Sequence, residues 1–354
     1  MSERTDDARN APEDRPAGAR LSLGRRRLFG LVSWLLPLAV LLGAELAGRW
    51  RGYGGYPPIF RHYGSEGGVH WYGTNAPGVN SFFVQHLPHA GGMRGFAFAT
   101  PKPPGTVRIV FIGESAMLGY PQEPSLTNSA FLASMLQDLW GPSRPVEVLN
   151  FGALAMASFP VLQFLDAALD HQPDLVVILC GNNEFYGAYG VASLHRAGAS
   201  PAAMRLVRAA RGLALVQWLE GRMAGAPEEG PARPQRAMEA MAAVRQVGPT
   251  DPLRRAAGRT LGTHLGKMVR LCAARRVPVI VCTVPTNERG MFPIGLDLPP
   301  PLPAERIREF GRHVDRAEAS LVPDPAGAAR ELQAAIALYD QHARSRFLLA
   351  RAWT

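Results

Sequence analysis

Four short, mostly apolar runs recur through the middle of the chain, and Arg108 alone interrupts the first of them. Continuous apolar runs of this length are typical of strands buried on both faces of a parallel sheet. Pro278 precedes the last run, where a strand can begin without losing a ladder hydrogen bond. The predicted strands are Val107–Ile112, Val146–Leu149, Leu175–Cys180 and Val279–Val284.

Apolar residues at helical spacing separate these runs. Leu126–Trp140 and Phe159–His171 show this spacing, and Ala202–Arg222 and Pro252–Ala274 are two further helical stretches. Strands that alternate with helices favour right-handed crossovers and a parallel sheet covered on both faces. The pattern predicts an α/β domain over residues 105–295, in which a parallel sheet lies between two layers of helices in a three-layer α/β/α arrangement.

The N-terminal segment combines a polar stretch with an apolar one. Residues 1–27 form a charged tail that we expect to be disordered, and residues 28–46 hold an apolar run as long as a short membrane-spanning helix. Arg25–Arg27 outweigh the arginines behind the run, which predicts a single-pass anchor in the inner membrane, a cytoplasmic N-terminus and a periplasmic main domain. A cleaved signal peptide and a buried amphipathic helix are the alternatives; a weak cleavage site and a lack of polar spacing favour the anchor.

Three other segments depart from the strand and helix pattern. Residues 50–104 are rich in Gly, Tyr, His and Pro, and are predicted to be an irregular lead-in. Residues 224–248 are interpreted as an insertion, either a mobile lid or a plain surface loop. Residues 303–354 are rich in Ala, Arg and Glu, and the helix–turn–helix of Ala328–Leu338 and Ala343–Trp353 resembles part of an incomplete tetratricopeptide array.

The composition of the chain limits the kinds of ligand and partner that we expect. The net charge is +9, but the arginines are scattered and form no stripe with interleaved aromatics, so no nucleic-acid partner is expected. Cys180, Cys272 and Cys282 form no Cys-x-x-Cys pair and are interpreted as buried thiols. The nearest histidine pair, His86 and His89, has no third ligand in view. We therefore expect neither a metal nor a cofactor.

The candidate chemistry lies where the predicted strands end. Ser115 follows the first strand, Gly152 the second and Asn183 the third. Open α/β sheets carry their chemistry outside the carboxyl ends of the strands. A hydroxyl, a small loop and an amide side chain are the parts of a serine acyl-transfer site, a nucleophile with oxyanion donors. Each also has a purely structural explanation: an N-cap, a tight turn and a turn cap.

In these blocks the chain resembles the SGNH (GDSL-type) hydrolases, named for a Ser, a Gly, an Asn and a His on separate blocks. Gly113–Ser115 matches the first block and Gly181–Glu184 the third, each with Glu for the usual Asp, and Asn150–Gly152 matches the second. GNNEFYG at 181–187 and TVPTN at 283–287 are most similar to a bacterial subgroup with an N-terminal membrane helix and tetratricopeptide repeats. The resemblance implies a flavodoxin-like SGNH fold.

The resemblance also implies the oxyanion donors. Ser115 would be the nucleophile, and its own N–H would be the first donor. The second would be the N–H of Ala155, which stands where the family's Asn-x-Gly-x-x-Gly pattern has its second Gly. The third would be the side-chain amide of Asn183, and Gly152, which matches the first Gly of the same pattern, is counted with the candidate catalytic residues.

The general base is the weak point of the resemblance. The family carries it in an Asp-x-x-His block, which does not occur in this sequence. Asp340 and His342 are one residue too close together to match this block, and they lie in the repeat-like helices. They are weak candidates for the base. In the subgroup the final block follows the repeats, and we expect it beyond Thr354.

Two function classes follow, and a third has less support. The first is a membrane-anchored SGNH-type ester hydrolase or acyltransferase, with an ester or an acylated carbohydrate as substrate. The second is a non-catalytic anchored scaffold, with a degenerate hydrolase domain and repeat helices that bind a protein partner. A nucleotide-binding α/β protein is disfavoured because no Gly-x-Gly-x-x-Gly follows any strand.

Overall fold

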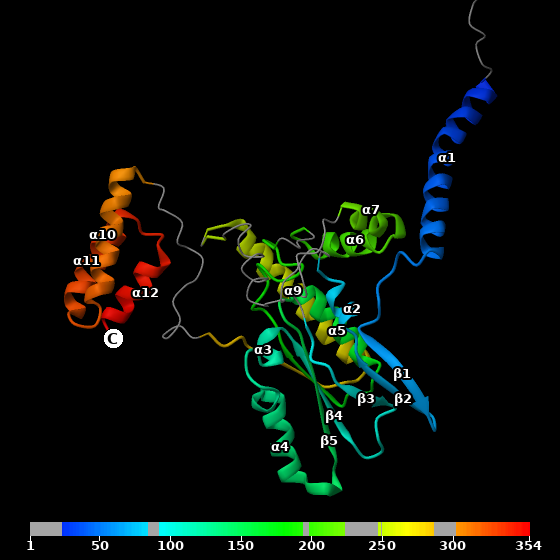
Figure 1. Ribbon diagram of the computed structural model, residues 1–354, viewed down its shortest axis with the longest axis horizontal. Coiled ribbons are helices and arrows are strands. Elements are labelled where there is room, and N and C mark those ends of the chain that lie inside the picture. Colours follow the sequence, from blue (N-terminus) through cyan, green and yellow to red (C-terminus); the bar gives the residue numbers. More distant parts are fainter. Residues whose placement is uncertain (1–22, 84–91, 194–197, 224–246, 249, 287–301) are drawn as a thin grey trace, which may run out of the picture.

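The computed structural model describes residues 23–83, 92–193, 198–223, 247–248, 250–286 and 302–354. At its centre is a parallel sheet in the order β5-β4-β6-β7 (Figure 1). The predicted disordered tail and most of the predicted insertion lie outside the described residues. The four strands match the four apolar runs and are β4 (Val107–Gly113), β5 (Val146–Gly152), β6 (Leu175–Leu179) and β7 (Val279–Cys282).

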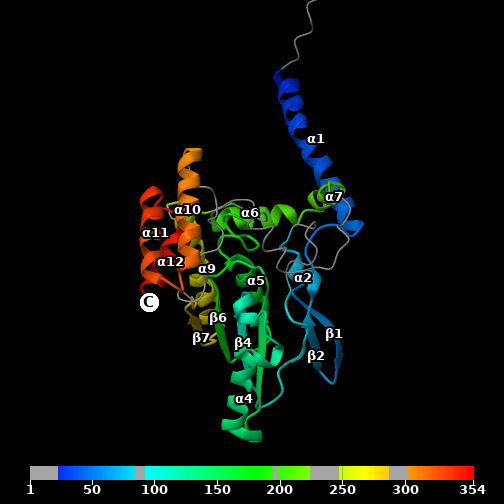
Figure 2. The same cartoon turned by 60° about the vertical axis from the view of Figure 1, so that its left-hand side comes forward.

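Helices cover both faces of this sheet, as Figures 1 and 2 show. Alternate residues of β4 and β6 point to opposite sides, so each face has its own hydrophobic cluster. One cluster packs against α5 (Ser158–Leu169) and α9 (Pro252–Ala274), and the other against α4 (Asn128–Trp140). The predicted α/β class with a parallel sheet between two helical layers is confirmed.

The predicted helix over 202–222 is instead two helices, α6 (Pro201–Arg211) and α7 (Ala214–Met223). The break falls at Gly212, whose backbone N–H bonds to the carbonyls of Arg208 and Ala209 and caps α6. Glycine weakens a helix interior because it has the most backbone freedom to lose. Shorter elements are α3 (Ser115–Leu118) and the 3₁₀ turns η1 (Pro124–Leu126) and η2 (Gly141–Ser143).

The lead-in is not irregular, contrary to the prediction for 50–104. It forms an antiparallel sheet in the order β1-β2-β3, together with the short helix α2 (Ala76–Asn80). Phe60 and Phe98 of this sheet pack on Phe151 of β5, with ring centroids 4.5 and 5.7 Å from it. The strands are β1 (Phe60–Glu66), β2 (Val69–Thr74) and β3 (Ala97–Thr100).

The ends of the chain form two helical units. At the N-terminal side α1 (Leu23–Trp50) is longer than predicted, and its stretch Phe29–Trp50 is apolar and long enough to cross a membrane. At the C-terminal side α10 (Ala304–Ser320), α11 (Pro325–Leu338) and α12 (Ala343–Ala352) pack together. Their hydrophobic cluster is separate from those of the sheet and includes Ala317, Ala328, Leu332 and Leu348.

Candidate active site

Ser115 lies at the carboxyl edge of the sheet, as the first residue of α3. The register sets Gly113 of β4 opposite Gly152 of β5 and Leu179 of β6. The ends of three strands therefore meet around Ser115. Its side chain is half-buried, and its Oγ makes no hydrogen bond with any residue that the structure describes.

The junction between α3 and β5 explains Gly152. A Cβ on this residue would lie 2.3 Å from the backbone nitrogen of Leu118, so α3 can approach the strand only over a glycine. Asn150 ties the same junction, because its side-chain Nδ2 donates to Met117 O at 2.9 Å and its Oδ1 accepts from Gly152 N–H at 2.9 Å. The Gly152 N–H is thus already bonded to Asn150. The glycine itself allows α3 and β5 to pack closely.

Glu114 fastens the turn that carries Asn183. It is fully buried, and its Oε2 accepts the N–H groups of Asn182 and Asn183 at 2.8 and 3.1 Å. Its Oε1 accepts the N–H of Gly181 at 3.0 Å. Since Glu114 directly precedes Ser115, the two candidate catalytic residues are joined through one carboxylate.

Three donors near the carboxyl edge lack partners among the described residues. The Nδ2 of Asn183 is buried and donates no hydrogen bond, although a buried amide donor without an acceptor is costly and uncommon. No described residue accepts from the backbone N–H of Ser115 or from that of Ala155. These are the three groups that the sequence blocks single out as oxyanion donors.

The Ala155 loop has an unusual backbone. Ala155 has φ of 56°, in the left-handed region that favours glycine, and glycine is the residue that the resembled Asn-x-Gly-x-x-Gly pattern has at this position. Its carbonyl accepts the Ala188 N–H at 2.7 Å, so its loop lies against the segment after Asn183. Gly187 allows this contact, since a Cβ there would be 2.9 Å from the nitrogen of Ala157.

Glu184 begins a buried polar chain that extends to α9. Its two oxygens accept from Ser158, Oε1 from the backbone N–H at 2.7 Å and Oε2 from the hydroxyl at 2.9 Å. The Ser158 Oγ also lies 2.8 Å from Nδ1 of His264. Burial raises the pKa of Glu184 to about 7 and lowers that of His264 to about 4, so the imidazole is neutral at neutral pH.

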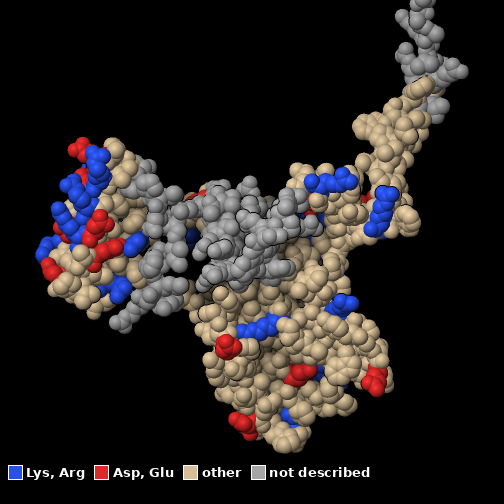
Figure 3. All heavy atoms as spheres, viewed as in Figure 1, with Lys and Arg blue, Asp and Glu red and all other residues tan. Residues whose placement is uncertain are grey.

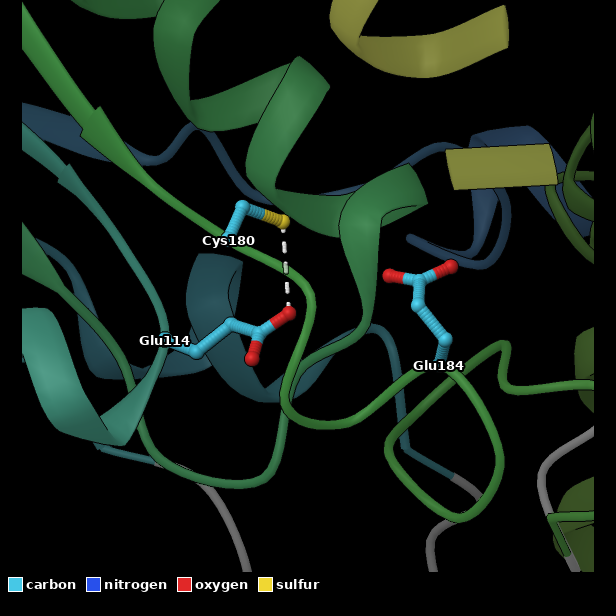
Figure 4. A group of neighbouring side chains, drawn as sticks. All are labelled: Glu114, Cys180 and Glu184. Carbon is cyan, nitrogen blue, oxygen red and sulfur yellow. Dashed lines mark hydrogen bonds between the residues drawn. The ribbon is translucent and has the colours of Figure 1, made fainter. Parts of the chain in front are cut away.

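Glu114, Cys180 and Glu184 gather their polar atoms within 4.8 Å, and Figure 4 shows the Cys180 thiol on Glu114. A cation would need free carboxylate oxygens. Those of Glu114 are occupied by three N–H groups and the thiol, and those of Glu184 by Ser158. Burial also raises the pKa of Cys180 well above its usual range, which keeps the thiol protonated. The hydrogen bonds of this cluster indicate that it stabilises the turn after β6 rather than binds a metal.

The weak candidates for the base lie elsewhere. His342 caps the N-terminus of α12, with its Nδ1 accepting the N–H of Ser345 at 3.2 Å, and its ring packs on Phe310 of α10. Asp340 is exposed in the turn before it. The described contacts do not bring this pair to Ser115, because both residues serve the fold of the C-terminal helices.

Sequence reasoning missed Ser158 and His264. Ser158 lies just outside the predicted helix over 159–171, and His264 lies inside a correctly predicted helix. One signal was available for His264, because Leu261 and Met268 are placed three residues before and four after it on the same helix face. A histidine within such an apolar stripe is expected to face the core.

Comparison with known proteins gives a likeness of fold only. No protein-family model matches the chain, and no curated protein matches it. Among solved structures, AlinE4, an SGNH-hydrolase family esterase, is 16% identical, with 62% of this chain and 97% of that one covered and a TM-score of 0.25. TesA is 17% identical, with 61% and 98% covered and a TM-score of 0.24. The residues of the site therefore carry the functional argument.

Proposed function

We propose that the chain is a membrane-anchored ester hydrolase or acyltransferase of the SGNH type, with Ser115 as its nucleophile. The observation that carries the proposal is the buried, unpaired Nδ2 of Asn183, whose backbone N–H bonds to the carboxylate of Glu114, the residue before Ser115. An oxyanion would supply the acceptor that this amide lacks in the folded protein. The esterase neighbours are in keeping with the proposal but do not carry it.

In the proposed reaction the Ser115 Oγ attacks the ester carbonyl carbon and loses its proton to a general base. The carbonyl oxygen becomes an oxyanion, which accepts from Ser115 N–H, Ala155 N–H and Asn183 Nδ2. Collapse expels the alcohol with a proton and leaves an acyl-serine. Water, or a sugar hydroxyl in a transferase, then attacks the acyl-serine and restores the free hydroxyl.

The anchor belongs to the same proposal. The stretch Phe29–Trp50 of α1 is about 33 Å long at 1.5 Å per residue, which suits a hydrocarbon core about 30 Å thick. The three arginines Arg25–Arg27 before it favour a cytoplasmic N-terminus and a catalytic domain on the periplasmic side of the inner membrane.

A second candidate function is the non-catalytic scaffold. It is favoured by the Ser115 Oγ, to which no described residue offers a base, and by the separate helical unit α10–α12, which could bind a protein partner. In this case the α/β domain would retain the oxyanion donors without turnover.

The test is the hydrolysis of a short-chain aryl ester, and labelling by a fluorophosphonate, of the full chain in detergent. We expect Ser115→Ala to abolish both, and Asn183→Ala to lower kcat about 100- to 1,000-fold because one oxyanion donor is lost. Asn182→Ala is the matched control, since this neighbour is exposed, and should leave the rate unchanged.

A folded wild type that neither turns over nor labels would overturn catalysis by these 354 residues, in favour of the scaffold or of a base supplied from beyond Thr354. If the wild type is active, single alanine variants of the nine histidines then locate the base. Loss of turnover in one of them would place the base in this chain.

A further inference from the structure

The helices α6 and α7 lie beside the lower end of α1 (Figures 1 and 2), and they carry exposed apolar side chains. On α7 the exposed side chains fall at helical spacing on one side, where Met223 is 75% exposed. On α6 Leu206 is similarly uncovered. We call this the α6–α7 face; its apolar members are Leu206, Leu213, Trp218, Leu219 and Met223.

The first turn of α7 is fixed to the end of α1 and to the turn that follows α1. The Leu215 N–H donates to Glu45 Oε2 at 3.2 Å. The Gln217 side chain accepts the Gly54 N–H at 2.8 Å and donates to the Gly55 carbonyl at 2.7 Å. The backbones lie close, because a Cβ on Gly48 would be 2.8 Å from the Ala214 Cβ. The orientation of the α6–α7 face relative to α1 is therefore set by direct contacts.

The other end of the pair is fixed to the α/β domain through α6. Met204 is buried in the main core, and the Arg208 guanidinium donates to Ser81 O at 2.6 Å. It also stacks on Tyr56 and Phe82, 3.3 and 3.9 Å from the ring centroids. The α6–α7 face is thus presented by a firm support rather than by a loose hairpin.

The depth of the face follows from its contacts with α1. If Phe29–Trp50 spans the bilayer, Glu45 and Trp50 mark its end, and the five-residue rise between them covers about 7.5 Å. The headgroup region on each side of a bilayer is about 5–8 Å thick. Since α7 contacts α1 at Glu45 and Gly48, within about 7.5 Å of the end of the span, it lies where the hydrocarbon core meets the headgroups.

The chemistry of the face suits that depth. Arg205 and Arg222 are exposed among its apolar side chains, and the Arg222 guanidinium lies 5.0 Å from the Trp218 ring centroid. Figure 3 shows basic side chains over α6 and α7 and again along the lower end of α1. Tryptophan and arginine beside apolar side chains are typical of helices that lie in the membrane interface, where anionic lipids attract the cations.

We propose that the α6–α7 face is a second membrane-contacting surface, which inserts its apolar side chains among the lipids around α1 and holds the α/β domain against an anionic bilayer. The inference rests on the proposed anchor, because the depth of α7 is measured from α1. It adds an orientation to that anchor: a single helix with a free hinge would let the domain tumble, whereas two contacts fix which edge of the domain meets the membrane.

The test places an environment-sensitive NBD dye at single cysteines in the full chain, in bilayers of phosphatidylcholine and phosphatidylglycerol. Cys282→Ser removes the one partly exposed native thiol among the described residues. The dye is attached at Leu219→Cys, at Leu139→Cys on α4 as an exposed site far from α1, and at Leu38→Cys within α1. We expect doxyl-labelled lipid to quench the dye at 219 several-fold more than at 139, and iodide to do the reverse.

The Leu38 site separates the two claims. Lipid quenching at both 219 and 38 supports the α6–α7 face together with the anchor on which it rests. A dye at 219 that is as open to iodide as that at 139 overturns the face, and quenching at 38 then shows that the anchor stands without it. If the dye at 38 also escapes lipid quenching, the anchor has failed as well.

Discussion

At the scale of single residues, the buried carboxyl of Glu184 makes the stability of the protein depend on pH. Burial raises its pKa to about 7, so between about pH 4.5 and 7 the folded protein keeps a proton that the unfolded chain releases. The stability that this proton confers is complete below about pH 4.5 and is lost as the pH rises through 7. Glu184→Gln should therefore gain stability relative to the wild type, by on the order of 1–3 kcal/mol, as the pH rises across this window.

The comparison is made by denaturant unfolding of both proteins at a series of pH values. The amide keeps one acceptor for the Ser158 N–H and carries no charge, so it imitates the protonated carboxyl. Glu123→Gln serves as the control, since its side chain is exposed, and its difference from wild type should not change with pH. A Glu184→Gln difference that stays flat with pH would mean that Glu184 is ionised throughout.

The sequence indicates some residues of this site and conceals others. Ser115 and Asn183 could be chosen because each follows an apolar strand and stands in a recognisable block. The hydrogen-bonded chain from Glu184 could not be chosen, because Ser158 is 26 residues from Glu184 in sequence and His264 is 106 residues from Ser158. Neither residue type is unusual at its position, and only the packing of α5 against α9 brings His264 to the serine that contacts the carboxylate.

At the scale of elements, Arg108 joins the two sheets. It is fully buried in β4, and its guanidinium donates to the Ala99 carbonyl of β3 at 2.7 Å and to the His171 carbonyl at 2.6 Å. It also bonds to Glu147 of β5 at 2.6 Å. We expect Arg108→Met to lower the free energy of unfolding by about 3–5 kcal/mol, because two buried carbonyls and a carboxylate lose their donors together.

Arg275→Met is the matched control for this prediction. Arg275 makes an ion pair with Asp170 at 2.9 Å, but both side chains are at least half exposed, and such pairs contribute about 0–1 kcal/mol. Chemical denaturation of the full chain in detergent compares the two variants. Equal losses from both would show that Arg108 is not the tie between the sheets.

The surroundings of the two sheets explain which strands the sequence could predict. The strands of the main sheet were found because both faces are covered, which makes their sequences continuously apolar. The strands β1 and β2 were missed because one face is open, and their buried positions hold Phe60 and Gly73 among His, Tyr and Gly rather than alternating aliphatic residues. What makes this sheet form is its contact with Phe151 and Arg108, far along the chain.

At the scale of the whole molecule, the described residues contain a helical unit with a core of its own. The helices α10, α11 and α12 enclose Ala317, Leu332 and Leu348, and this cluster shares no member with those of the α/β domain. Because each core is a separate set of contacts, damage to one should be felt mainly within it. This expectation can be tested without removing any part of the chain.

Leu332→Ala removes a fully buried side chain from the centre of the C-terminal cluster, which typically costs about 2–5 kcal/mol. We expect amide hydrogen exchange in α10–α12 to accelerate by on the order of 100-fold, while exchange in β4–β7 and fluorophosphonate labelling of Ser115 stay unchanged. Val322→Ala is the control, since Val322 is 86% exposed between α10 and α11. Faster exchange in the strands, or slower labelling of Ser115, would show that the C-terminal helices support the candidate active site, and the base should then be sought among their side chains.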